Sequence, residues 1–262
     1  MMAALPRLSP GAAGRALHSP AVGRHMHACK HACVQESTFA RRTSTLGGCA
    51  FAGGLASAAH GRVRRMATAG ENARVRESGM PPVDYWETLV DAEGTLDRLG
   101  LAPCKQLKVL EFGCGYGTFS VPVAKRVGEL FTFDLDEGMV ELTRKRALDE
   151  GLGNVRASVR DLVADGYGVE PGSVNAVLLM NILHCQDPVG MLRDAASLLP
   201  AGGLVYAYHW RYDEGTPRGP PMAIRPRPEQ LEEWALATGL LRTLHGPVDC
   251  PPWHYGWVFE RS

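Results

Sequence analysis

Short apolar runs alternate with amphipathic stretches over most of the chain beyond residue 100. Runs rich in Val, Leu and Phe predict five strands, and the segments between them have helical periodicity. Parallel neighbours need crossovers, and right-handed crossovers place helices on both sheet faces, so we expect a doubly wound, mostly parallel α/β fold. The expected strands are residues 107–112, 130–134, 155–159, 174–180 and 204–209, and the expected helices are residues 118–126, 137–150 and 188–199.

The pattern differs at the two ends of this region. Residues 84–99 have broadly helical spacing, with Asp84 as a candidate N-cap. Residues 228–238 predict another helix, and residues 240–244 and 253–260 predict two late strands. The turn between those strands contains Cys250-Pro251-Pro252, which favours an antiparallel pair over another parallel unit. One domain over residues 71–262 is the expected organisation.

Charge separates the chain into two chemically different pieces. Residues 1–70 hold nine basic residues and one acid, Glu36, and therefore carry a net charge of +8. Because the whole chain sums to zero, residues 71–262 carry −8. The first piece lacks an apolar period that could bury a core and resembles an organellar transit peptide, with a plastid favoured over a mitochondrion.

An export signal, a later start and a metal site are also considered for this part of the chain. Arg41 and Arg42 precede a weakly apolar run, as in a twin-arginine export signal. Met66 or Met80 could serve as a start, which would predict a cytoplasmic protein. The alternating His and Cys residues between positions 25 and 33 lack a scaffold, so we expect no metal site there. The chain has no C-x-x-C pair, which favours free thiols in a reducing compartment.

The segment VLEFGCGYGTFS, residues 109–120, carries the strongest chemical signal. Gly113, Gly115 and Gly117 follow a predicted strand and precede a predicted helix, so bare main chain can bend sharply and contact a bulky ligand. A dinucleotide fingerprint needs G-x-G-x-x-G, whose last position is Thr118 here. A nicotinamide oxidoreductase is therefore a weaker alternative.

Three acids accompany the glycine loop. Asp134 ends the second predicted strand, where a carboxylate can accept hydrogen bonds from both hydroxyls of a ribose. Asp161 follows the third strand and could accept from an exocyclic adenine amine, and Glu111 could face an ammonium or sulfonium group. Asp136 is interpreted as a helix N-cap. The acids and glycines together predict a nucleoside site at the switch point of the sheet.

With these residues in place, the chain resembles a class I S-adenosylmethionine-dependent methyltransferase over roughly residues 80–260. The resemblance rests on VLEFGCGYGTFS, FTFDLDEGMVELTRKRA, VRDL, NAVLLMNILHC and GMLRDAASLLPAGGLVYAYHW in that order. It implies a seven-stranded sheet of order 3-2-1-4-5-7-6 whose last strand is antiparallel. The expected activity is methyl transfer from S-adenosylmethionine to a small-molecule acceptor, and a non-catalytic binding or assembly protein is the rival reading.

The resemblance also implies roles for individual residues. Asp134 would hold the ribose, Asp161 and Leu162 would flank the adenine, and Asn181 would lie beside the reacting sulfonium. Because LVADGYGVEPGS follows Asp161 without the usual apolar-Pro turn, the adenine contacts depart most from the family pattern. The full set of implied cofactor contacts is Glu111, Gly113, Gly115, Gly117, Asp134, Leu135, Asp161, Leu162 and Asn181.

Candidates for acid–base chemistry lie at the ends of the fourth and fifth strands. A base is needed only if the acceptor is protonated, as a phenol or amine is. We expect His209 to be the better base, with His184 and Asn181 as further catalytic candidates and no metal. Strand alternation lets either His254 or Tyr255 reach the same cleft while the other packs elsewhere.

A Pro-rich segment at residues 211–228 follows the fifth strand and is expected to cover the acceptor. Its four arginines, at positions 211, 218, 225 and 227, could hold an anionic acceptor or could be solvated. The acidic charge of residues 71–262 argues against nucleic acid as a partner. No run of 18 apolar residues predicts a membrane span.

Overall fold

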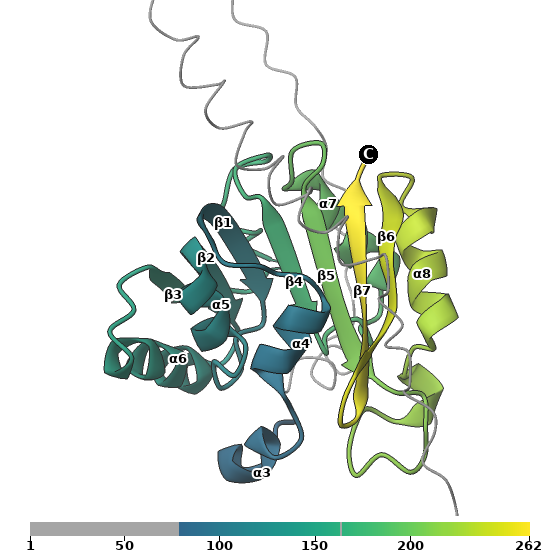
Figure 1. Cartoon of the computed structure of the whole chain (residues 1–262), viewed down its shortest axis with the longest axis horizontal. Coiled ribbons are helices and arrows are strands. Elements are labelled where there is room, and N and C mark those ends of the chain that lie inside the picture. The colour runs from purple at the N-terminus through teal and green to yellow at the C-terminus, as the bar shows by residue number, and fades with distance from the viewer. Residues whose placement is uncertain (1–78, 163) are drawn as a thin grey trace, which may run out of the picture.

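Seven strands form one sheet in the order β3-β2-β1-β4-β5-β7-β6 (Figure 1). The computed structural model describes residues 79–162 and 164–262, so the leader interpretations for residues 1–70 lie outside the described residues. All neighbours are parallel except β7, which runs antiparallel to both β5 and β6, as predicted. The strands are β1 (Cys104–Phe112), β2 (Val127–Asp134), β3 (Val155–Val159), β4 (Ala176–Met180), β5 (Leu204–Trp210), β6 (Leu241–Cys250) and β7 (His254–Arg261).

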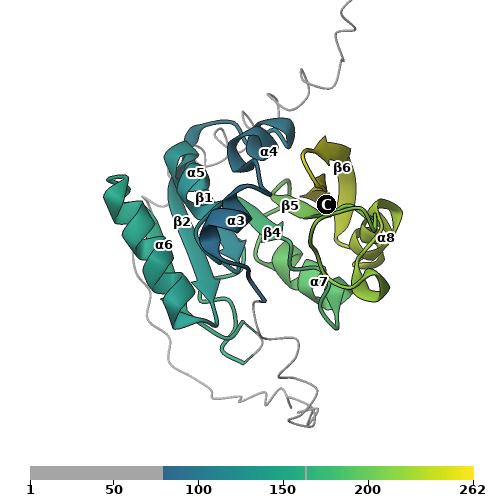
Figure 2. The same cartoon turned by 90° about the horizontal axis from the view of Figure 1, so that it is seen from below.

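Helices cover both faces of the sheet (Figure 2). The helices α4, α5 and α6 lie on one face, and α7 and α8 lie on the other, as right-handed crossovers require. Asp136 caps α6, as predicted, because its side chain accepts a hydrogen bond from the backbone N–H of Gly138 at 2.8 Å. The helices are α3 (Val83–Glu87), α4 (Ala92–Arg98), α5 (Ser120–Arg126), α6 (Glu137–Asp149), α7 (Pro188–Ser197) and α8 (Pro228–Ala237), with a short 3-10 turn η1 (Met222–Ile224).

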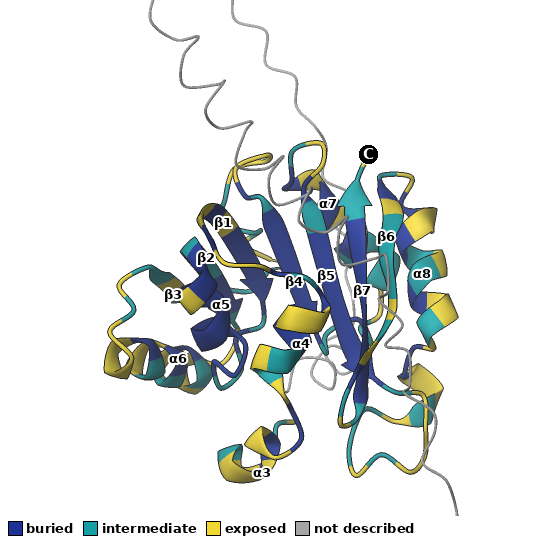
Figure 3. Ribbon diagram, viewed as in Figure 1, coloured by how far each residue is buried: buried dark blue, intermediate teal, exposed yellow. Residues whose placement is uncertain are grey.

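The central strands are buried on both faces (Figure 3). Every residue of β4 is buried, and successive β1 residues pack into opposite layers: Val109 faces α4 and α5, whereas Leu110 faces α7 and α8. This double burial explains why the strands appear in the sequence as continuous apolar runs rather than as alternating patterns.

The crossover from β3 to β4 contains no helix among its described residues. Tyr167 covers this part of the α7 face, because its ring stacks on Phe112 with centroids 4.9 Å apart. Its hydroxyl donates a 2.6 Å hydrogen bond to Asp194 on α7. The Gly- and Pro-rich sequence of residues 166–172 favours this loop over a helix.

The helix predicted at residues 84–99 is wrong, because the structure has two short helices there. Residue Val90 forms an isolated bridge with Pro252, and Asp91 caps α4 by accepting from the N–H of Gly94. The predicted cap, Asp84, instead lies inside α3. A long-range contact with the end of β6 thus overrides the local helical periodicity.

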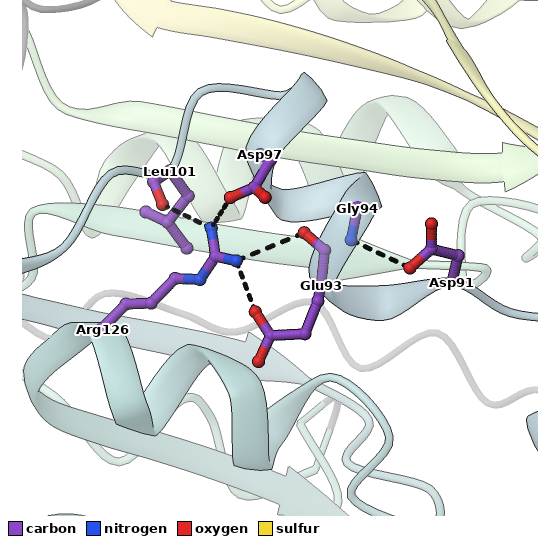
Figure 4. Close-up of polar contacts among 6 residues, drawn as sticks. All are labelled: Asp91, Glu93, Gly94, Asp97, Leu101 and Arg126. Carbon is purple, nitrogen blue, oxygen red and sulfur yellow. Dashed lines mark hydrogen bonds and ion pairs between the residues drawn. The ribbon is translucent and has the colours of Figure 1, made fainter.

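Arg126 at the end of α5 fastens α4 to this face of the fold (Figure 4). Its buried guanidinium donates to the Asp97 carboxylate at 2.7 Å and to the Leu101 carbonyl at 3.0 Å. It also donates to the carboxylate and the carbonyl of Glu93. Four acceptors from α4 and the turn that follows it therefore converge on one side chain.

Two further features concern the described residues as a set. None of their helices combines the length and apolarity that crossing a bilayer requires. Their four cysteines are all free thiols, as the spacing predicted: Cys104, Cys114, Cys185 and Cys250.

Candidate active site

The glycine loop joins β1 to α5 at the carboxyl end of the sheet. Gly113, Gly115 and Gly117 all have left-handed backbone, with φ of +79°, +48° and +75°. At Gly117 space is also short, because an added Cβ would lie 3.0 Å from the Thr143 hydroxyl. Side chains would strain this loop, so its main chain stays bare, as the spacing predicted.

Asp134 lies directly beside this loop at the end of β2. One carboxylate oxygen accepts a 2.9 Å hydrogen bond from the Gly115 N–H, and the other accepts a 3.1 Å bond from the Asp136 N–H. The residue is only half-buried. A carboxylate has about four acceptor positions, so two of them remain for other donors.

Glu111 lies beneath the loop rather than on its surface. Its carboxylate is 1% exposed and accepts hydrogen bonds from Ser120 at 2.5 Å and Thr132 at 2.8 Å. Burial raises the pKa of this carboxyl to about 7, although the two hydroxyls oppose the shift. The bonds tie the start of α5 and the second half of β2 to β1, so the structure shows a role in holding the loop.

The remaining predicted adenine contacts lie at the ends of β2 and β3. The Asp134 carbonyl accepts a 2.8 Å hydrogen bond from the Arg160 N–H, which brings Asp161 to the same edge of the sheet. The Asp161 carboxylate accepts a 3.2 Å bond from the Ala164 N–H. Leu135 is 43% exposed, whereas Leu162 is half-buried against the core layer under α7 and α8.

Asn181 ends β4 in a conformation that is unusual for a residue with a side chain. Its φ is +55°, and its amide nitrogen lies 3.3 Å from Nε2 of His254. None of the described residues bonds its buried Oδ1. Strain and an unpaired buried acceptor at the end of a central strand are typical of functional sites.

His254 enters this cluster from β7. Its fully buried imidazole lies between the rings of Tyr208 and Trp210, with centroids 4.3 and 4.1 Å away. Burial, aided by Arg211 and Arg225, lowers the pKa of His254 to about 3, so the ring is neutral at pH 7. Alternation predicted that either His254 or its neighbour would reach the cleft, and Tyr255 packs in the opposite core layer.

Two imidazoles, those of His184 and His209, contact each other on the other face of the sheet. Nδ1 of His184 is 3.3 Å from Nε2 of His209. His209 is fully buried, and burial, then the neighbouring His184, holds its pKa well below the usual value. His184 is half-buried, and its pKa is lowered by burial alone.

The His184 side of this pair opens into a pocket of about 430 Å³ between the β4–α7 loop, η1 and α8. His209 does not line it. The pocket is lined by His184, Cys185, Gln186, Asp187, Pro188, Val189, Ala223, Ile224, Arg225, Gln230 and Trp234.

The arginines of the segment after β5 mostly hold that segment in place. Arg225 donates to the carbonyls of residues 211, 213 and 220 and to the Thr216 hydroxyl. Arg211 pairs with Asp249, Arg218 donates to the carbonyl of residue 79, and Arg227 lies over the Tyr212 ring. The four therefore do not form the anion-binding cluster that the sequence suggested as one alternative.

The sequence reading missed the contacts that bring α3 over the glycine loop. Trp86 donates from its indole to Thr118 at 3.1 Å, and Tyr116 donates to the Pro81 carbonyl at 2.6 Å. Glu87 accepts from Thr118 at 3.0 Å and from Arg146 at 2.7 Å. Only the general placement of a helix near residue 86 was visible in the apolar pattern, because these partners lie about 30 or more residues apart.

Residues 109–203 match the methyltransferase-domain family, and this stretch spans the glycine loop, Asp134, Asp161 and Asn181. The seven-stranded sheet around this stretch has the fold of a solved S-adenosylmethionine-dependent methyltransferase. S-adenosylmethionine is the cofactor of this family.

Known relatives match the chain over different spans. It is 28% identical to a ubiquinone biosynthesis O-methyltransferase of Parvibaculum lavamentivorans over 47% of this chain and 48% of the relative, so it spans about half of that protein. It is also 28% identical to aklanonic acid methyltransferase DauC of a Streptomyces species over 59% of this chain and 86% of the relative. A SAM-dependent methyltransferase from Aquifex aeolicus shares the fold, with a TM-score of 0.60 at 18% identity over 72% of this chain and 98% of that one.

The residues of this site fit S-adenosylmethionine better than a dinucleotide. A pyrophosphate needs free main-chain N–H groups from a glycine loop, but the Gly115 N–H already donates to the Asp134 carboxylate. Burial and, to a smaller extent, the nearby Asp134 carboxylate raise the pKa of the Glu111 carboxyl. Hydroxyl donors and a sulfonium cation suit such an acceptor-rich site, whereas phosphates do not.

Proposed function

We propose that this protein transfers a methyl group from S-adenosylmethionine to a small-molecule acceptor. The observation that carries the proposal is the contact between the Asp134 carboxylate and the Gly115 N–H inside a left-handed glycine loop. It places acceptor oxygens where ribose hydroxyls would lie and removes the donor that a pyrophosphate needs. The nicotinamide alternative therefore loses support.

Each part of the chain would contribute one task. S-adenosylmethionine supplies a methyl group already activated on a sulfonium. The bare loop lets the cofactor rest on main chain, while Asp134 accepts from the ribose hydroxyls and Leu135 offers an exposed apolar surface to the adenine. Asp161 and Leu162 would flank that ring, and Asn181 would place its unpaired Oδ1 beside the reacting groups. Alignment and exclusion of water then account for most of the rate.

The structure favours His184 over His209 as the base, which reverses the ranking made from sequence. A base must touch the proton that it removes, and His209 is 0% exposed while His184 lines the pocket. Strand β5 pairs with β7 as far as Trp210 and His254, so its end is covered rather than open. His209 would instead act through its contact with His184.

A small acceptor is supported by the size of the pocket and by the charge of the body. About 430 Å³ lies within the range of small-molecule sites and is far too small for a folded macromolecule. Residues 71–262 carry −8, which disfavours nucleic acid.

Labelled-methyl transfer tests this function. The full chain is incubated with methyl-labelled S-adenosylmethionine and a fractionated small-molecule extract of its own organism. We expect one small molecule to gain a single methyl mass, and we expect Asp134→Asn to abolish most of that label. Glu137→Gln, an exposed acid three residues later, should leave it intact. If no fraction gains label while the cofactor binds, the non-catalytic binding reading replaces ours.

We also propose that residues 1–70 direct the protein to an organelle. Their +8 charge and lack of an apolar period support this. Fusing these residues to a fluorescent protein should place it in a plastid. Export by a twin-arginine pathway, or a cytoplasmic signal from a chain starting at Met66 or Met80, would contradict the proposal.

A further inference from the structure

The pocket on the α7 and α8 face has walls suited to a flat ring. Trp234 lies in one wall as a half-buried indole, and Ile224, which is half-exposed, lies in another. Pro188 and Val189 add apolar surface at the start of α7. Aromatic and branched apolar groups around a concave site of this size favour a planar, largely apolar ligand.

The polar end of the pocket is His184, and its partner restricts which nitrogen carries the proton. If Nδ1 of His184 carries the proton, it donates to Nε2 of His209, and Nε2 of His184 is left with a free lone pair. The burial of His209 keeps that ring neutral, so its Nε2 remains an acceptor when His184 becomes charged. The two facing nitrogens share one proton, and in the tautomer with that proton on Nδ1 of His184 the free Nε2 can act as a base.

Charge in the pocket disfavours a cationic ligand. Arg225 lines it and is held in place by carbonyls of its own segment. The one lining carboxylate, Asp187, accepts a 2.8 Å hydrogen bond from the Gly190 N–H as the cap of α7. Burial lowers the pKa of His184, because a positive charge loses hydration there. An ammonium acceptor would carry the same desolvation cost beside the Arg225 cation, whereas an oxygen that gains negative charge would be favoured by that cation.

The strength of the base narrows the acceptor further. Burial lowers the pKa of His184 below its ordinary 6.5. A phenolic hydroxyl has a pKa of about 10, so proton transfer to such a base is uphill by more than roughly 10³. An alkyl hydroxyl resembles water, with a pKa of about 16, and the factor exceeds roughly 10⁹. The phenol is therefore the easier of the two acceptors for this base.

We propose that this pocket is the acceptor site and that it takes a planar compound bearing an aromatic or enolic hydroxyl, whose proton passes to Nε2 of His184. The proposal rests on the proposed methyl transfer and names the acceptor class for it. The acceptor oxygen keeps the O–H electron pair and forms the new bond to the methyl carbon. The carbon–sulfur bond breaks with its electrons left on sulfur, and the proton on His184 later returns to solvent.

Ligand binding is tested on the full chain with catechol, benzyl alcohol and benzylamine, which are similar in size. The protein is saturated with S-adenosylhomocysteine, and the resonances of a fluorinated Trp234 and of ¹⁵N-labelled His184 are followed. We expect catechol to shift both signals at millimolar concentration and benzylamine to bind at least 10-fold more weakly. Equal binding of benzylamine, or no shift with catechol, overturns the proposal.

Matched variants separate the pocket from the rest of the fold. Trp234→Ala should weaken catechol binding at least 5-fold, whereas Leu236→Ala, an exposed residue on the same helix, should leave it unchanged. His184→Gln should leave S-adenosylhomocysteine affinity unchanged and remove the rise in transfer rate that accompanies deprotonation of His184, which occurs below pH 6.5 because burial lowers its pKa. If both helix variants behave alike, the ligand lies elsewhere.

Turnover with the same three compounds completes the test. With methyl-labelled S-adenosylmethionine we expect label on catechol and none on benzyl alcohol or benzylamine. Label on the alkyl hydroxyl at a similar rate overturns the inference about acceptor class. If S-adenosylhomocysteine fails to bind, the proposed function itself fails, and the Trp234 shifts still report independently whether the pocket takes a phenol.

Discussion

The side-chain amide nitrogen of Asn181 lies 3.3 Å from Nε2 of His254, although 73 residues separate them in the sequence. The contact joins the end of β4 to the start of β7 across β5. It holds a left-handed residue whose Oδ1 has no partner among the described residues. The late antiparallel strand therefore contributes to the site at which we place the methyl transfer.

We predict that Asn181 and His254 are energetically coupled. His254→Phe keeps an aromatic ring between Tyr208 and Trp210 but leaves the Asn181 amide unpaired, so unfolding free energy should fall by about 1–3 kcal/mol. Combined with Asn181→Ala, the effects should be non-additive by about 0.5–3 kcal/mol in a double-mutant cycle measured by urea unfolding. Additive effects would show that the contact does not hold Asn181.

Because the pKa of Glu111 is raised, we predict that the unfolding free energy of the protein changes with pH. Its pKa is raised from 4.5 to about 7 on folding, so the folded state binds the proton more tightly than the unfolded state. The favourable contribution is complete below pH 4.5 and is lost as pH rises through 7. Glu111→Gln has no such loss, so its stability relative to the natural chain should improve by about 3 kcal/mol between pH 4.5 and pH 8.

The comparison is made as a difference between two proteins at each pH. The pKa values of the buried imidazoles of His184, His209 and His254 are lowered, so these residues lose their contribution as pH falls below about 6.5. These imidazoles are present in both proteins, so their contributions cancel in the stability difference. A stability difference that is flat across this range would contradict the buried position of Glu111.

We predict that replacing Arg126 lowers the unfolding free energy more than replacing Lys145, although both residues form ion pairs. Its side chain is buried, and removing it in Arg126→Met leaves the Leu101 carbonyl without its donor and frees α4. We expect a loss of about 1–3 kcal/mol, because the partner acids are themselves exposed. Lys145→Met breaks an exposed pair with Asp149 and should cost less than about 0.5 kcal/mol by thermal unfolding. Equal losses of stability would contradict the conclusion that the Arg126 contacts in Figure 4 hold α4 in place.

Local pattern was enough to predict much of the fold and the position of Asp134 beside the glycine loop. The strand β4 is a single apolar run, β1 ends just before Gly113 and β2 ends at Asp134, so Gly113 and Asp134 could be placed at one edge of the sheet from sequence. Their contact through Gly115 fits that placement.

The acceptor side could not be predicted, because it depends on pairing between distant segments. The burial of His209 follows from β7 covering β5, which the sequence of β5 does not encode. The donors of Arg225 are satisfied by carbonyls of a Pro-rich loop, a backbone geometry that has no residue signature. The break between α3 and α4 likewise depends on Pro252, more than 150 residues later.

Calorimetric titration of the full chain with S-adenosylhomocysteine and with NADH tests the central claim most directly. We predict a dissociation constant for S-adenosylhomocysteine on the order of 10 μM or tighter, with no measurable heat from NADH. Asp134→Ala should weaken binding by about 10-fold or more, because it removes a charged acceptor. Tighter binding of NADH, or no binding of S-adenosylhomocysteine by the natural chain, would contradict the account.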